Sequence, residues 1–177
     1  MSAKAIKRQR TREYLMKMLY QMESQGDFSD ELKQNFIDGY IVEDLTDTLN
    51  NEAWDKAVGA EKPKMLQASE VASAISKYLD MDYFNAVFEA YISHNNETDD
   101  LIESFSRGWK LERIAKVDLS ILRLCITELK WMKDAGIPTA ASISEAVRIA
   151  KIYGSDDSGK FVNGILGKIY REAADER

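Results

Sequence analysis

The sequence predicts an all-α protein that folds as a single compact domain of about seven or more helices. Apolar residues recur every three to four positions in nearly every segment, the spacing of one buried helix face. The chain has 177 residues but only 9 glycines and 2 prolines, and one hydrophobic core typically serves a chain of this length. Its most apolar segment, residues 118–132, is apolar nearly all round, which is typical of a helix at the centre of a fold.

The first third predicts two helices separated by a short turn. The first helix is expected from about Ile6 to Ser24, and Gly26 is placed to end it. A second helix, with Tyr40 on its buried face, is expected after Ser29 and should fade near residues 50–51. Serine suits the start of this helix because its hydroxyl can accept a hydrogen bond from a free backbone N–H group.

Residues 52–67 interrupt the helical pattern. They include Val58, Gly59 and Pro63 and have little apolar periodicity, which predicts a loop or a loosely attached insertion. Helix is expected to resume between about residues 71 and 92. We therefore expect residues 29–80 to form a long acidic segment that is partly loop-like.

Capping residues predict the helix boundaries in the second half. Asp118 is expected to cap the most apolar helix, which should stop at Gly136. Ser142 and Glu145 have the spacing of a capping box. The last helix is expected to open around residues 156–158.

The composition argues against several kinds of chemistry. His94 is the only histidine and lies in a polar stretch, typical of an exposed helix end, and Cys125 is the only cysteine and lies in the apolar central helix. A zinc site of Cys and His ligands needs three or four such residues, and no Gly-rich phosphate loop is present. We expect a non-enzymatic protein without metal or cofactor. No secretory signal or membrane span is recognised, which favours the cytoplasm.

Charge is distributed unevenly, although the chain as a whole carries a net charge of −6. Residues 1–17 contain six basic residues and one acidic residue. Residues 27–55 contain nine acidic residues and one lysine. The position of the charge is therefore more informative about partners than its total.

The basic residues of the first helical turns predict a compact positive patch. Lys7, Arg8, Arg10 and Arg12 would project together, and the planar guanidinium group suits phosphate oxygens and stacking on bases. Contact with nucleic acid is one interpretation. The other is that these residues only increase solubility, and composition alone does not decide between them.

Longer motifs do decide between them. The segment WKLERIAKVDLSILRLCITEL (109–129) is followed by Ile-Pro at 137–138, ISEAVRIAKIYG at 143–154 and SGKFVNGIL at 158–166. With the arginines, Leu19 and Tyr20 of the first helix, these motifs resemble the NusB family of bacterial transcription antitermination factors in order and spacing. Two departures are Ser144, where the family usually has Asn, and the length of the acidic segment.

The resemblance implies an all-helical domain that binds the boxA element of ribosomal-operon RNA. By the same resemblance, we expect it to bind together with NusE, a ribosomal protein, within the RNA polymerase antitermination complex. A monomer and a homodimer that hides the RNA face both fit the sequence. The RNA-binding residues that the resemblance implies are Lys7, Arg8, Arg10, Arg12, Tyr20, Glu112, Asp118, Asp157, Ser158, Lys160 and Phe161.

Several of these residues also have a structural interpretation. Phe161 lies on the apolar stripe of the last helix, and Tyr20 could be a core residue with its hydroxyl at the edge. Asp118, Asp157 and Ser158 are good N-cap residues whatever else they do. Both interpretations stay open from the sequence.

Two rival functions also remain. One is a helical protein-interaction module with no RNA role, whose working surface is the acidic segment. The other is a NusB-like RNA-binding domain related to those that precede the catalytic domain of ribosomal-RNA cytosine methyltransferases, although the sequence offers no room for such a catalytic domain.

Overall fold

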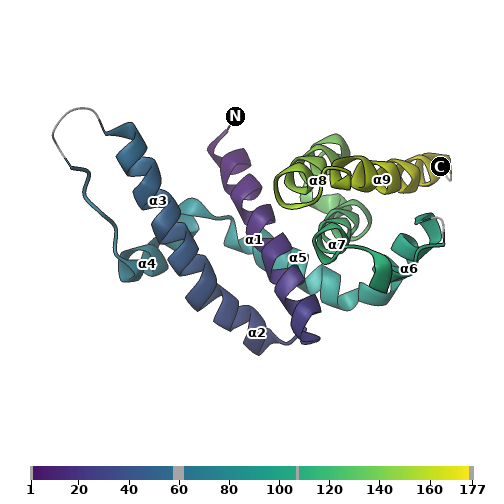
Figure 1. Cartoon of the computed structure of the whole chain (residues 1–177), viewed down its shortest axis with the longest axis horizontal. Helices are drawn as coiled ribbons and strands as arrows, with labels where there is room; N and C mark the ends of the chain where they lie inside the picture. The colour runs from purple at the N-terminus through teal and green to yellow at the C-terminus, as the bar shows by residue number, and fades with distance from the viewer. Residues whose placement is uncertain (1, 58–61, 107, 176–177) are drawn as a thin grey trace.

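The chain folds into packed helices joined by turns, as the sequence predicts (Figure 1). The computed structural model describes residues 2–57, 62–106 and 108–175, and within these ranges there is no β-strand. The predicted all-α class is therefore confirmed. Of the described helices, none combines the length and apolar character that crossing a bilayer requires.

The helices and short helical turns follow one another in the order of the chain. They are α1 (Ala3–Gln25), α2 (Asp30–Asn35), η1 (Phe36–Ile41), α3 (Val42–Lys56), α4 (Ala68–Tyr78), α5 (Met81–Ser93), α6 (Asn95–Phe105), η2 (Leu111–Arg113), α7 (Lys116–Trp131), η3 (Lys133–Ala135), α8 (Thr139–Tyr153) and α9 (Ser158–Asp175).

Helix α7 is the centre of the fold. It packs against α1, α5, α6, α8 and α9, and residues 118–128 are all buried. This confirms the central helix predicted from its apolar character. Cys125 lies within it, and burial raises the pKa of the Cys125 thiol to about 12, so the thiol is an inert core group.

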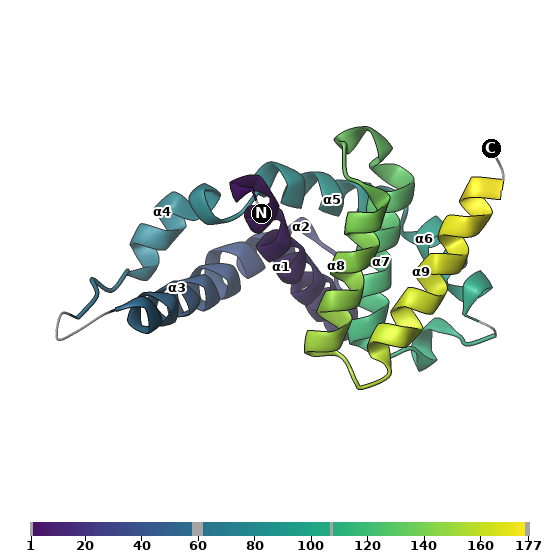
Figure 2. The ribbon, with the colours of Figure 1, turned by 90° about the horizontal axis from the view of Figure 1, so that it is seen from above.

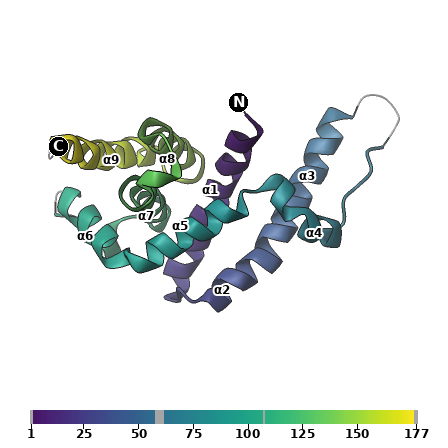
Figure 3. The ribbon, with the colours of Figure 1, turned by 180° about the vertical axis from the view of Figure 1, so that it is seen from behind.

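Helix α1 lies between two parts of the molecule. Helices α7, α8 and α9 lie on one side of it, and α3 and α4 extend away on the other (Figures 1 and 2). The view from behind shows the same arrangement (Figure 3). One helix can therefore offer side chains to both parts.

The long segment after Ser29 is more helical than predicted. Ser29 does cap α2, because its hydroxyl accepts from Leu32 N at 3.2 Å. The expected end near residues 50–51 is wrong, since α3 continues to Lys56. The Asn50 side chain, rather than ending the helix, donates to Leu66 O at 3.0 Å and accepts from Leu66 N at 2.7 Å.

Residues 58–61 of the predicted loop, Val58 and Gly59 among them, fall outside the described residues. Tyr40 also departs from expectation, because it is 41% exposed rather than buried. Residues 36–41 form a π-helical stretch, which changes the phase of the helix and turns Tyr40 outward.

Two helices begin at residues other than those predicted from the sequence. Gly26 ends α1 with φ +67°, as predicted. However, α7 begins at Lys116, so Asp118 lies inside its first turn instead of capping it. Helix α8 begins at Thr139, where Pro138 O accepts from the N–H groups of residues 141 and 142, so the expected capping box is wrong.

Candidate functional site

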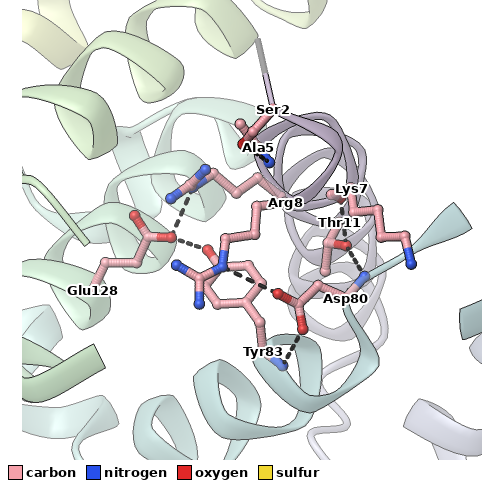
Figure 4. A network of polar contacts seen from close by, with 9 residues as sticks. Ser2, Ala5, Lys7, Arg8, Thr11, Asp80, Tyr83 and Glu128 are labelled. Atoms are coloured by element: carbon pink, nitrogen blue, oxygen red, sulfur yellow. Dashed lines mark hydrogen bonds and ion pairs between the residues drawn. The ribbon is translucent and has the colours of Figure 1, made fainter. Parts of the chain in front are cut away.

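Arg12 is buried and does not join a projecting patch. Only 6% of its surface is exposed, and its Nε donates to Glu128 Oε1 at 2.8 Å. The Tyr83 hydroxyl donates to the same carboxylate oxygen (Figure 4). The Arg12 guanidinium carbon lies 5.4 Å from the centroid of the Tyr83 ring. Burial raises the pKa of Glu128, with Arg12 opposing this shift. The prediction that Arg12 projects with the other basic residues is therefore wrong, and its contacts give it a structural role.

The other three residues of the predicted patch, Lys7, Arg8 and Arg10, are part-exposed, but each contacts the acidic segment. Arg8 Nε lies 3.1 Å from Asp80 Oδ2, and Arg10 Nη2 lies 2.7 Å from Glu52 Oε1. Lys7 Nζ donates to the backbone carbonyl of Ser76 at 2.7 Å. The projecting positive patch expected from the sequence is thus paired within the molecule. The sequence could not show this because the partners lie 42 to 72 positions away.

An aromatic groove of about 420 Å³ lies beside the second half of α1. It is lined by Tyr20, Tyr40 and Tyr153, whose side chains are 36–42% exposed, with Val117 from the start of α7. Exposed aromatic rings are the surfaces on which unpaired bases stack. The groove therefore joins Tyr20 to two tyrosines that sequence reasoning had not assigned to the site.

Lys17 supplies a positive charge to this groove. Its Nζ lies 5.3–5.6 Å from the ring centroids of Tyr14, Tyr40 and Tyr153, and 3.2 Å from Asp44 Oδ2. Although burial alone would lower it, the pKa of Lys17 is raised by Tyr40, Tyr153 and Asp44. The ammonium group stays charged at neutral pH.

The turn between α8 and α9 follows directly after Tyr153. The Ser158 hydroxyl accepts from Ser155 N at 2.9 Å. Asp118 lies close to it, and burial raises the pKa of Asp118 while Ser158 opposes the shift. Asp118 and Ser158 are 6% and 1% exposed, so these two predicted RNA contacts lie beneath the surface and support the turn.

Gly154→Ala is expected to disturb this turn. A Cβ atom at residue 154 would overlap the Ser158 side chain and lie 2.7 Å from Ala150 O. Overpacking of this kind typically costs about 1–3 kcal/mol of unfolding free energy, measured here by urea denaturation. Gly164→Ala is the matched control, since nothing lies within 4 Å of its Cβ position, and it should be neutral or stabilising. Equal stability of the two variants would contradict the prediction.

The remaining predicted residues divide into exposed and half-buried positions. Asp157, Lys160 and Glu112 are exposed, Glu112 on η2 and Lys160 in the first turn of α9. Phe161 is half-buried and packs against the core. The structure brings Tyr20 close to the α8–α9 turn, but it does not gather all the predicted residues into one cluster.

Within the described residues, no group of three or more His, Cys, Asp or Glu side chains is arranged to hold a metal ion. His94 lies between α5 and α6, where its ring stacks on Trp131 at 4.0 Å between centroids and 10° between planes. Stacking on Trp131 gives the His94 ring a structural role.

Known proteins resemble this chain along most of its length. The profile of the NusB family matches residues 52–171. The chain is 34% identical to the transcription antitermination protein NusB of Clostridium botulinum (strain Kyoto / Type A2) over 93% of this chain and 99% of that protein. It is 36% identical to the protein of the same name from Acetivibrio thermocellus, over 93% and 88% of the two chains.

Solved structures agree with this assignment. T. maritima NusB matches with a TM-score of 0.59 and 32% identity over 93% of this chain and 90% of that one. A structure of the antitermination factors NusB and NusE in complex with dsRNA matches in fold, with a TM-score of 0.61 and 21% identity over 93% and 96%. The sequence resemblance is confirmed, and the chain belongs to the NusB family.

Proposed function

We propose that this protein is a cytoplasmic, non-enzymatic antitermination factor that binds boxA-type single-stranded RNA of ribosomal operons together with NusE. The NusB relatives are named for transcription antitermination, and a structural neighbour contains NusB and NusE in complex with dsRNA. Membership of the family supports the same role here. The partner protein would add contacts and fix the RNA face, so each ligand should strengthen binding of the other.

The aromatic groove beside α1 is the observation that carries the RNA role. Three exposed tyrosines around one ammonium group provide surfaces for unstacked bases and a charge for a phosphate. We assign base stacking to Tyr20 and Tyr153 and phosphate contact to Lys17. Arg8 and Arg10 extend the positive surface along α1.

The α8–α9 turn continues the proposed RNA face. Lys160 and Asp157 are exposed there and can offer polar contacts. Phe161 is half-buried, so its edge can contact a base while the rest of its ring packs on the core. Glu112 and Lys7 are assigned to the margin of this face, while Arg12, Asp118 and Ser158 hold it in shape from below.

The proposal is tested by fluorescence anisotropy of a labelled boxA-like RNA and a scrambled RNA, each with and without purified NusE. Tighter binding to boxA that strengthens with NusE is expected. Equal and weak binding to both RNAs would overturn the boxA assignment. Absence of RNA binding, with retained NusE binding, would favour a protein-interaction module.

Tyr20→Ala is expected to weaken binding of the boxA-like RNA by about 1–3 kcal/mol, the usual effect of losing one stacked base. Tyr20→Phe keeps the ring and should bind almost as tightly as the unmodified protein. Tyr170→Ala is the matched control, because Tyr170 is similarly exposed but lies on α9 in a different groove. If both alanine variants bind alike, the groove does not receive a base.

A further inference from the structure

We infer that the acidic segment competes with RNA phosphates for the basic side chains of α1, so that the protein masks part of its own RNA face. This inference rests on the proposed function and concerns its regulation. The acidic arm is defined here as α3, α4 and the residues that connect α4 to α5 (residues 42–80, of which 58–61 lie outside the described part).

The contacts between α1 and the acidic arm run along the helix. Arg8 pairs with Asp80, Arg10 with Glu52 and Lys17 with Asp44, and Lys7 donates to the carbonyl of Ser76. Asp44 lies near the start of α3 and Glu52 in its last turns. Ser76 lies near the end of α4, and Asp80 lies between α4 and α5. Three cations of α1 between residues 8 and 17 are therefore paired with carboxylates of the acidic arm.

Carboxylates and phosphates present the same chemistry to these cations. Both offer anionic oxygens that accept hydrogen bonds from a guanidinium or ammonium group at similar distances. Arg10 already donates to a Glu52 oxygen at 2.7 Å, a distance at which a phosphate oxygen would also sit. A bound RNA must therefore exchange with the arm for these donors.

The pairs are accessible enough for such exchange. The side chains of the three ion pairs are between 18% and 38% exposed to solvent. In contrast, the side chains of Arg12 and Glu128 are 8% and 1% exposed. Part-exposed pairs are weak and are screened by salt. Among the basic side chains of α1, Arg12 is thus held in a buried ion pair, whereas Arg8, Arg10 and Lys17 form replaceable ones.

The decisive variant is Glu52→Gln, which removes one competing carboxylate while preserving the shape of the side chain. We expect about two- to fivefold tighter binding of the boxA-like RNA, corresponding to the small strength of one exposed pair. The gain should shrink as salt is raised. Asp44→Asn frees Lys17 in the same way and should give a gain of similar size.

Two controls separate masking from a general change of charge. Asp47→Asn removes the same charge from an exposed position of α3, so it reports the effect of charge alone. Because Glu52 also contacts Lys56 at 3.2 Å, Glu52→Gln is repeated with Arg10→Ala present. Masking predicts that the gain disappears in this background.

The outcomes distinguish the two claims. Masking is overturned, and the RNA function is left intact, if Glu52→Gln and Asp44→Asn bind the boxA-like RNA no more tightly than Asp47→Asn does. A gain that persists with Arg10→Ala would also overturn it. If none of the proteins binds RNA although each keeps its circular dichroism spectrum, both the proposed function and masking are overturned.

Discussion

Arg12→Ala is expected to lower the free energy of unfolding by about 3–5 kcal/mol, because it leaves the buried Glu128 carboxylate without its cation. Glu128 is 3% exposed, and the Tyr83 hydroxyl, which still donates to it, is neutral. Urea denaturation at neutral pH measures the loss. Arg10→Ala is the matched control, because its pair with Glu52 is part-exposed and should contribute less than about 1 kcal/mol.

The deficit of Arg12→Ala should also depend on pH. Burial already raises the pKa of Glu128, and loss of Arg12 removes an opposing effect, so the folded variant takes up a proton more readily than its unfolded chain. Stability then increases as pH falls through the pKa of the folded state and is lost as pH rises through it. A variant that is fully stable but no longer binds RNA would show instead that Arg12 contacts phosphate.

Arg123→Ala is expected to cost a similar amount, about 3–5 kcal/mol of unfolding free energy. Its guanidinium donates twice to Asp99 at 2.8 Å and once to Glu23 at 2.6 Å. The rings of Phe28 and Tyr91 lie 5.9 Å away. Although burial acts to lower it, the pKa of Arg123 is raised by Asp99, Tyr91 and Glu23. The arginine therefore joins α1, α6 and α7 through one charge.

Arg148→Ala provides the comparison for Arg123. Arg148 also contacts two carboxylates, Glu13 at 2.6 Å and Glu145 at 3.0 Å, but its side chain is 29% exposed and that of Arg123 is 6% exposed. Denaturant unfolding should show a much smaller loss for Arg148→Ala, because water can solvate the carboxylates that it leaves. Comparable losses would contradict the assignment of Arg123 as the stronger link.

Local signals in the sequence predicted much of the fold. Gly26 ends α1 because it adopts a positive φ, and Ser29 caps α2 because its hydroxyl reaches a free backbone N–H. The same kind of signal failed at Asp118 and Ser142, which are good capping residues buried within helices. Capping propensity is a local preference, and the tertiary packing of α7 and α8 overrides it at these two positions.

The sequence by itself determined that the chain is helical, that the apolar segment 118–132 forms its centre, and that it belongs with the NusB proteins. These properties follow from periodicity and from motifs that lie close together in the chain. Which charges meet depended on the tertiary structure. Arg12 contacts Glu128, 116 positions away in the chain, and Arg10 contacts Glu52, 42 positions away. Only the packing of α1 between the acidic arm and helices α7–α9 therefore decided that Arg12 is fixed in the core while Arg10 is available for exchange.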